Sequence, residues 1–168
     1  MSGPGLLDEA LLLKALPRAG WQRIGISDPE SVAAHSWGVA WLALLLRPPG
    51  LDQERILSLA IIHDIAEIRV GDITPYDGVS RSEKHRRERR AARDLLAHRP
   101  ELLGLWEDYA TRSSPEARFV HQLDKVDMAL QARHYARHRG HDTREFIQNA
   151  RAAVSHPTLV SLLDELDD

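Results

Sequence analysis

Near the middle of the chain stands the sequence Leu59-Ala-Ile-Ile-His-Asp-Ile-Ala-Glu-Ile-Arg-Val-Gly-Asp72, which sets the pair His63-Asp64 inside an apolar run. The apolar residues recur at helical spacing and predict one buried helix over residues 53–68, capped by Asp52. A buried imidazole and carboxylate must find partners, because an unpaired polar group costs free energy in an apolar setting. The stretch therefore predicts either a satisfied core histidine or a functional site.

Two further carboxylates accompany this pair. Glu67 follows His63 by four residues, so in a continuous helix both project from one face. Asp72 follows Gly71, the residue at which the helix should end. Four groups able to bind a metal or move protons thus lie within ten residues. Since a lone His-Asp pair is more often structural than functional, the interpretation depends on the ligands that other segments offer.

The composition is that of a helical protein without a strongly charged partner. Of the 168 residues 43% are apolar, 28% are charged and 5% are aromatic, in the range of ordinary globular proteins. The net charge of −3 provides no basic field for nucleic acid or an anionic membrane. Without cysteine, disulfides, iron–sulfur clusters and thiolate zinc sites are excluded. With no signal peptide and no apolar run that could span a bilayer, we expect a cytoplasmic protein.

Helical periodicity recurs along the chain, and no stretch shows the alternation typical of a strand. We therefore expect an all-α fold in one domain over residues 1–168. The predicted helices cover residues 6–16, 30–46, 53–68, 82–98, 101–110, 115–139, 143–154 and 157–166. Asp28 or Ser27 is expected to cap the second of these helices and Ser114 the sixth.

Several residues also have a structural interpretation. Trp37, Trp41 and Trp106 are expected to be packing residues, and Trp21 is equally suited to the core or to a binding pocket. The dense charges over residues 83–90 predict a solvated helix face.

Three predicted helices each offer metal ligands: His35, the pair His63-Asp64, and Asp124. Asp127 lies on the same helix as Asp124, and spacing alone does not choose between them. Two imidazoles and two carboxylates from separate helices would hold a metal and leave coordination positions open for water. This ligand set suits Mn, Co, Mg, Ni, Fe or Zn, and ligand type does not separate these metals.

The chain resembles the HD-domain metal-dependent phosphohydrolases, whose H…HD…D pattern these ligands reproduce, over residues 12–166. The segments that resemble its HD domain-containing protein 2 group are Pro17-Arg-Ala-Gly-Trp21, Pro29-Glu-Ser-Val-Ala-Ala-His35, His63-Asp-Ile-Ala-Glu-Ile-Arg-Val-Gly-Asp-Ile-Thr-Pro75, Glu83-Lys-His-Arg-Arg-Glu88 and Phe119-Val-His-Gln-Leu-Asp124. That group belongs to the 5′-deoxynucleotidases, which cleave deoxyribonucleoside 5′-monophosphates to deoxynucleoside and phosphate. The resemblance implies an HD-domain helical bundle with a buried metal site, its metal-binding core at about residues 30–135 and C-terminal helices at residues 143–166.

The resemblance also implies roles in metal binding and catalysis. One divalent metal would be bound by His35, His63, Asp64 and Asp124. Glu67 would act as the general acid or base. Asp72 would contact the substrate ribose, or together with Glu67 a second cation.

For the substrate, the resemblance implies that Trp21 lines the sugar or base pocket and that the Ile73 carbonyl lies nearby. Arg18 or Arg23 would neutralise the phosphate, whose oxygens suit a planar guanidinium. Bacterial nucleotidases of this family carry an arginine directly before the tryptophan, where this chain has Gly20. The choice between the two arginines therefore stays open.

Other functions compete with the nucleotidase. An HD-type phosphodiesterase or (p)ppGpp hydrolase would share the metal site, but (p)ppGpp hydrolases carry paired acids after the HD, and here Ile68 follows Glu67. A mixed-valent di-iron oxygenase would need additional histidines. A non-enzymatic metal-bound helical scaffold would not need the full acidic set. As partners we expect a deoxyribonucleoside 5′-monophosphate and a second copy of the chain, joined in a homodimer through the long helices and residues 102–109, with no nucleic acid and no membrane.

Overall fold

The computed structural model describes residues 4–167, which form only helices and the turns between them. The helices are α1 (Pro4–Leu11), η1 (Leu12–Lys14), α2 (Ala19–Arg23), α3 (Val32–Leu46), α4 (Gln53–Ile62), α5 (Glu67–Val70), α6 (Arg81–Leu95), α7 (Pro100–Thr111), α8 (Pro115–Arg139), α9 (Arg144–Ala153), α10 (Pro157–Asp164) and η2 (Glu165–Asp167). The all-α prediction is confirmed. Pro17 and Ser31 form an isolated antiparallel bridge. Within residues 4–167, no helix combines the length and the apolar character needed to cross a bilayer.

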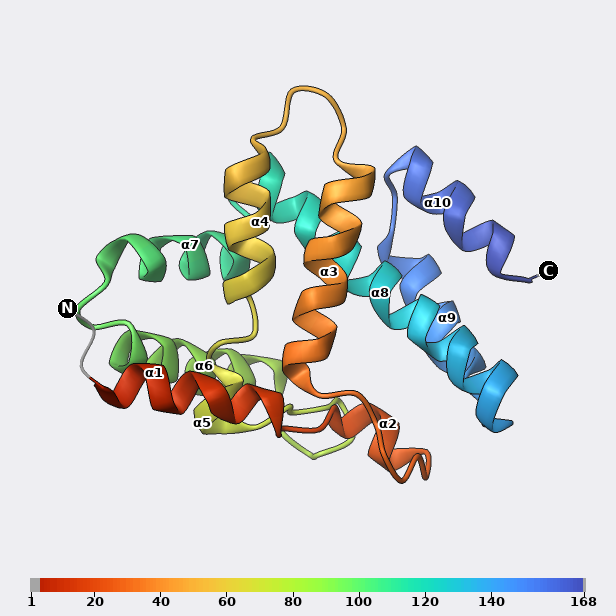
Figure 1. Cartoon of the computed structure of the whole chain (residues 1–168), viewed down its shortest axis with the longest axis horizontal. Helices are drawn as coiled ribbons and strands as arrows, with labels where there is room; N and C mark the ends of the chain where they lie inside the picture. The colour runs from red at the N-terminus through yellow and green to blue at the C-terminus, as the bar shows by residue number, and fades with distance from the viewer. Residues whose placement is uncertain (1–3, 168) are drawn as a thin grey trace.

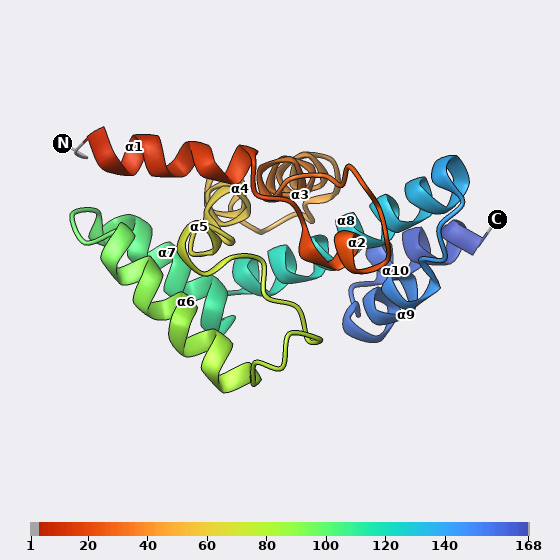
Figure 2. The same cartoon turned by 90° about the horizontal axis from the view of Figure 1, so that it is seen from below.

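Helices α3, α4 and α8 form the centre of the molecule. Figures 1 and 2 show the long α8 crossing behind α3 and α4, with α6 and α7 on one side and α9 and α10 on the other. The main core joins these elements through fully buried residues such as Val39, Leu59 and Leu123. A second cluster around Trp106 lies between α6 and α7, and a third surrounds Trp21. The central helices thus place their inner faces against one another, where the site is built.

Side-chain caps set the starts of the central helices. Asp52 caps α4 and Ser114 caps α8, as predicted. The start of α3 differs, because its cap is Ser31 and not Asp28 or Ser27. The bridge between Ser31 and the N-terminal segment keeps the preceding residues out of the helix.

The region around the His-Asp pair departs from the predicted continuous helix. Helix α4 ends at Ile62, and residues 63–66 form a tight turn that leads into α5. Across this turn the hydrogen bonds join residues three apart, including Glu67 N to the Asp64 carbonyl at 3.0 Å, as in a 3₁₀ turn. The single-helix prediction is therefore wrong here, and so is the assumption that Glu67 lies one α-helical turn beyond His63. The connector at residues 18–26 likewise contains the short helix α2.

The tryptophans divide between core and surface. Trp106 is 3% exposed, which confirms its predicted packing role. Trp37 and Trp41 lie on the outer side of α3 with 69% and 47% of their surface exposed, so the packing prediction is wrong for these two within the chain. Since α3 is apolar on nearly all sides, its pattern does not tell the buried face from the exposed one.

Candidate metal centre

Two histidines meet where α3 packs on α4. His35 lies in the first turn of α3 and His63 directly follows α4, and their Nε2 atoms are 3.4 Å apart. Asp64 Oδ2 lies 3.1 Å from His63 Nε2 and 3.7 Å from His35 Nε2. Asp124 reaches in from α8 and places Oδ1 3.3 Å from His35 Nε2. The structure therefore brings together all four residues that the sequence predicts as metal ligands.

The second ring nitrogen of each histidine is already engaged. His35 Nδ1 lies 2.7 Å from Asp127 Oδ2, and His63 Nδ1 lies 2.7 Å from the Ala60 carbonyl. Both partners accept hydrogen bonds, so each Nδ1 carries a proton and each neutral ring presents a lone pair at Nε2. When both rings are neutral, two lone pairs and two carboxylates face one small volume. This donor set fits a divalent metal ion, whose charge would stabilise the converging acceptors.

The pKa values reflect this crowding of acceptors. Burial and Arg18 oppose protonation of His35, but its hydrogen bonds to Asp124 and Asp127 prevail and raise its pKa to about 9. Burial would raise the pKa of Asp64, yet the charge of His63 and its hydrogen bond hold that pKa below the usual range. A proton on His35 therefore stabilises the cluster in the way a metal would, and proton and metal compete for it.

Asp127 supports the cluster from outside it. The sequence does not decide whether Asp124 or Asp127 is the metal ligand. In the structure they contact different atoms of His35, Asp124 the Nε2 atom and Asp127 the Nδ1 atom. Gly38 makes room for Asp127, since a Cβ at position 38 would lie 2.1 Å from Asp127 Oδ1. A carboxylate on the second nitrogen fixes the tautomer and the orientation of a ligating histidine. Gly38 was missed in the sequence, although a glycine inside a helical pattern often has a packing reason.

Glu67 and Asp72 lie beside the cluster in different environments. Glu67 is buried, and its Oε2 finds no hydrogen-bond partner among the described residues. Burial, followed by the charges of Asp64 and Asp72, raises the pKa of Glu67 well above its usual value. Asp72 is held by the backbone N–H of Ala19, which donates to its Oδ2 at 2.8 Å. A carboxyl group with a raised pKa keeps its proton to higher pH than usual, which suits the role of a general acid.

The two candidate arginines have different partners. Arg18 Nη1 lies 3.7 Å from Asp64 Oδ2 and 3.8 Å from Asp72 Oδ1. These carboxylates raise the pKa of Arg18 although its burial opposes them. Arg23 instead forms an ion pair with Glu145 of α9. The structure therefore brings Arg18, but not Arg23, into contact with the acidic residues of the cluster.

Trp21 and the Ile73 carbonyl both have partners within the chain. Trp21 is 2% exposed, with its ring centroid 5.3 Å from that of Tyr135 and 4.3 Å from that of Phe146. These contacts are those of a core anchor, one of the two interpretations that the sequence allows. The Ile73 carbonyl accepts a hydrogen bond from Lys84 Nζ at 2.7 Å. A role of either residue in a substrate pocket stays a prediction.

Two residues that the sequence did not single out contact Asp124. The Tyr109 hydroxyl of α7 donates to Asp124 Oδ2 at 3.3 Å, and its ring centroid lies 5.1 Å from that of His63. Lys125 Nζ lies 3.0 Å from the same carboxylate oxygen. Burial and the charge of Asp124 raise the pKa of Tyr109 well above its usual value, so its hydroxyl stays a donor. No motif spacing identifies Tyr109, because it reaches the site from a helix of its own.

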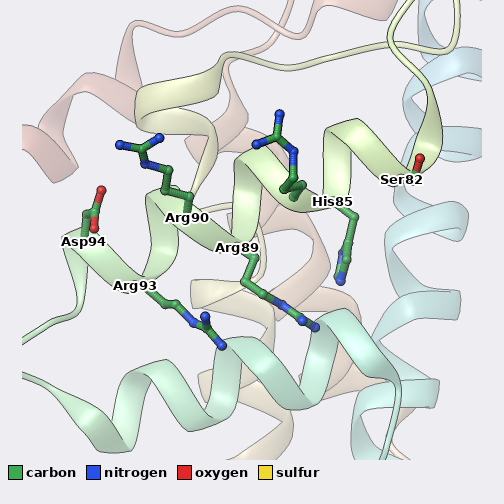
Figure 3. Close-up of a pocket in the computed structure, with 7 residues that line it drawn as sticks. Ser82, His85, Arg89, Arg90, Arg93 and Asp94 are labelled. Carbon is green, nitrogen blue, oxygen red and sulfur yellow. The ribbon is translucent and has the colours of Figure 1, made fainter.

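The charged helix α6 carries a surface groove apart from this cluster. This groove has a volume of about 360 Å³ and is lined by Ser82, His85, Arg86, Arg89, Arg90, Arg93 and Asp94. Figure 3 shows how the lining side chains project from α6. Arg86 pairs with Glu83, and Arg93 pairs with Glu107. None of the predicted site residues lines it, and its exposed charges agree with the solvated face that the charge run predicts.

Comparison with known proteins relates this geometry to one family. A family model described as HD domain matches residues 11–163. The protein named 5′-deoxynucleotidase HDDC2 from Bos taurus is 42% identical, over 92% of this chain and 79% of its own length. The human protein of that name is 40% identical with the same coverage. The 5′-deoxynucleotidase hdd1 of Schizosaccharomyces pombe is 40% identical over 78% of this chain and 71% of its own.

Solved structures agree with this relationship. PH0347 protein from Pyrococcus horikoshii OT3 has a TM-score of 0.80 at 34% identity, with 96% of each chain covered. A protein described as a predicted metal-dependent phosphohydrolase from Magnetospirillum magnetotacticum has a TM-score of 0.74 at 27% identity, covering 98% of this chain and 88% of its own.

Proposed function

The chain belongs to the HD-domain family, and from that membership we propose that it is a metal-dependent 5′-deoxynucleotidase, an enzyme that hydrolyses deoxyribonucleoside 5′-monophosphates to deoxynucleoside and phosphate. Relatives of that name match nearly the whole chain at about 40% identity. The observation that carries the proposal is the convergence of two histidine Nε2 atoms and two carboxylates on one buried volume.

We propose His35, His63, Asp64 and Asp124 as the ligands of one divalent metal. When bound there, Mn, Co, Mg, Ni, Fe or Zn would supply Lewis-acid polarisation of a phosphoryl oxygen and activation of water.

The chain's own groups would handle the proton and the phosphate. The raised pKa of Glu67 supports its role as the general acid that donates to the leaving 5′ oxygen. Arg18 is the favoured phosphate ligand of the two arginines, because its guanidinium already lies beside the cluster. Asp72 would accept a hydrogen bond from a ribose hydroxyl. As an alternative to these roles in proton transfer and ribose binding, Glu67, whose Oε2 has no partner among the described residues, and Asp72 would bind a second cation. Trp21 and the Ile73 carbonyl would border the sugar.

We further propose one cytoplasmic domain over residues 1–168, with a metal-binding core at about residues 30–135, that acts on a nucleotide and binds neither nucleic acid nor membrane. We also propose a homodimer. Of the two surfaces predicted for it, residues 102–109 are unsuitable, because Leu102, Leu105 and Trp106 pack against α6 and the neighbouring core within the chain. The long helices remain as the proposed surface.

The test of the activity is phosphate release from deoxyribo- and ribonucleoside 5′-monophosphates by chelator-treated protein. Mn²⁺, Co²⁺, Mg²⁺, Ni²⁺, Fe²⁺ and Zn²⁺ are added back singly, and Asp64→Ala serves as the control. The proposal expects metal-dependent release that favours the deoxy substrates and is lost in the variant. Folded protein that binds a metal but releases no phosphate with any of them would contradict it.

A further inference from the structure

Tyr76 presents one face of its ring to solvent, at the tip of the segment that joins α5 to α6. The side chain is 64% exposed. Arg23 of α2 covers the opposite face, with its Cζ 4.0 Å from the ring centroid. The Tyr76 hydroxyl donates to Glu145 Oε2 of α9 at 3.3 Å. Figure 2 shows the segment looping out on the side of the molecule where α2 and α9 lie. Two other helices therefore hold the ring in place before anything binds to it.

The Tyr76 ring is the outer end of a column of packed planar groups. The Arg23 guanidinium lies over both the Tyr76 ring and the Phe146 ring, with Cζ 4.0 Å and 5.7 Å from the two centroids. The Phe146 ring packs in turn on Trp21, with centroids 4.3 Å apart, and both side chains are buried. Gly20 makes room for this contact, because a Cβ there would lie 3.3 Å from the Phe146 ring. Since the column connects Tyr76 to the core, a ligand that stacks on its ring loses little affinity to ordering it.

The segment that carries Tyr76 begins at the metal centre. Asp72 accepts a hydrogen bond from the backbone N–H of the first residue of α2 at 2.8 Å, and its Oδ1 lies 3.8 Å from Arg18 Nη1. Arg18 directly precedes α2 and Arg23 ends it, so the chain advances about 7.5 Å along the helix between the two arginines. Helix α2 and the segment after α5 therefore both lead from the cluster to the Tyr76 ring. The base of a mononucleotide whose phosphate lies at the cluster would reach this ring.

We propose that the open face of Tyr76 stacks on the nucleobase of the substrate, an inference that rests on the proposed nucleotidase function and deepens it. Every base presents a flat π-face, and stacking on one aromatic side chain tightens binding by about 5- to 100-fold. The Tyr76 hydroxyl is engaged by Glu145 and does not read the edge of the base. The site therefore accepts all four bases and favours purines, whose larger ring system covers more of the phenol ring. Tyr76 selects for the presence and the size of the base, while the cluster acts on the phosphate.

The alternative is a purely structural clasp, in which Tyr76 only ties the segment to α2 and α9. The segment has other hydrogen bonds that hold it. The Thr74 backbone N–H and hydroxyl both donate to Asp77 Oδ2, at 2.6 Å and 2.8 Å, and Lys84 Nζ donates to the Ile73 carbonyl at 2.7 Å. A clasp would also gain stability by burying its ring, whereas Tyr76 is mostly exposed. These observations favour a ring that is held ready for a ligand.

The first test compares substrates with and without a base. Tyr76→Leu removes the aromatic face and should raise KM for deoxyadenosine 5′-monophosphate by about 5- to 100-fold, with little change in kcat. The rise should be smaller for deoxycytidine 5′-monophosphate and absent for 2-deoxyribose 5-phosphate, which carries no base. Tyr76→Phe keeps the ring and should restore KM to within a few-fold of the wild-type value. Arg23→Ala should raise KM only a few-fold, because the ring remains.

The second test measures binding without turnover. Isothermal titration of Mn²⁺-loaded Glu67→Gln protein gives the Kd of each of the three ligands. Adding Tyr76→Leu should weaken binding of the two nucleotides by the same factors as in the kinetic test and leave the Kd of 2-deoxyribose 5-phosphate as it was. Adding Tyr76→Phe should restore nucleotide binding. Circular dichroism verifies that each variant is folded.

Several results would overturn the proposal. A loss in Tyr76→Leu that is as large for 2-deoxyribose 5-phosphate as for the nucleotides would make Tyr76 a structural clasp, and so would a Tyr76→Phe variant that is as impaired as Tyr76→Leu. Unchanged nucleotide binding in Tyr76→Leu would place the base elsewhere. Failure of the proposed function gives a different result: protein that binds nucleotides through Tyr76 but releases no phosphate would contradict the nucleotidase and support the base site. Wild type that binds no nucleotide would contradict both.

Discussion

Asp127 Oδ2 lies 2.7 Å from His35 Nδ1. The other ring nitrogen of His35, Nε2, faces the candidate metal ligands Asp64, His63 and Asp124. This contact assigns the proton to Nδ1 and orients the ring, so Nε2 is left to bind a cation. We therefore propose that Asp127 acts by orienting His35.

Asp127→Asn should weaken metal binding by about 10- to 100-fold, because the neutral amide orients and polarises His35 less strongly. Isothermal titration of the chelator-treated protein with Mn²⁺ measures this change. Asp142→Asn, which removes a carboxylate from an exposed pair with Arg144, is the matched control and should bind as wild type does. Equal affinities for the two variants would show that Asp127 does not position His35.

Gly38→Ala should destabilise the protein by about 1–3 kcal/mol, because the added Cβ would collide with the Asp127 carboxylate. Gly104→Ala, also inside a helix but with no atom near the new Cβ, should stabilise it by up to about 1 kcal/mol. Urea denaturation of both variants gives the comparison. In an Asp127→Ala background the cost of Gly38→Ala should largely disappear, and a cost that persists would place the clash elsewhere.

The metal-free protein should lose stability as the pH rises from about 6.5 to about 9. The folded-state pKa of His35 is raised to about 9 from 6.5, so protonated His35 stabilises the fold fully below pH 6.5 and this contribution is lost as pH rises through the folded pKa, amounting to about 3 kcal/mol. Thermal melts in chelator across this range measure the effect. Excess Mn²⁺ should remove most of the slope, and a melting temperature that stays constant in chelator would contradict the competition between proton and metal.

Glu67→Gln should lower kcat by at least about 100-fold while metal affinity changes little, because the amide fills the same space but transfers no proton. The wild-type rate should fall on the alkaline side as Glu67 ionises, since its acid form is the active one, and the variant should lack this limb. Glu101→Gln, an exposed carboxylate on α7, is the control. A variant with an unchanged pH–rate profile would assign the proton to another group.

Arg18→Ala should raise KM for the nucleotide and reduce kcat/KM by about 100-fold or more, because a charge-assisted contact to phosphate would be lost. Arg23→Ala should leave kcat/KM within a few-fold of wild type and cost at most about 1 kcal/mol of stability, since its pair with Glu145 is half exposed. Steady-state kinetics of the two variants decide between the arginines. A larger loss of kcat/KM in Arg23→Ala than in Arg18→Ala would identify Arg23 as the phosphate ligand.

Local patterns account for what the sequence predicted well. The helix over residues 115–139 and the caps Asp52 and Ser114 follow from nearest-neighbour chemistry, and the structure confirms them. The break at residues 63–66 was not predicted, because the apolar periodicity continues through the turn. Only the backbone hydrogen bonds change there, from partners four residues apart to partners three residues apart. The periodic pattern records which side chains are apolar, and it does not record how the backbone pairs.

In the candidate site, too, local motifs identify some residues, and the others are known only from the packing of the helices. A short motif identifies His63 and Asp64, but the separate partners of Asp124 and Asp127 depend on how α8 is rotated against α3, which spacing does not reveal. The hydrogen bond from Tyr109 to Asp124 depends on how α7 packs against α8, which the sequence does not reveal either. The exposure of Trp37 and Trp41 could not be predicted, since every side of α3 is apolar in that region.

The distribution of the cluster along the chain has a consequence for biosynthesis. His35 and His63 are translated early, whereas Asp124 and the positioning Asp127 both belong to α8, which follows α7. A nascent chain therefore leaves the ribosome with three of its four proposed metal ligands long before the fourth exists. If these residues bind the metal as proposed, its tight binding would come late, once α8 has packed on α3 and α4, and a chain truncated before α8 would hold the ion weakly.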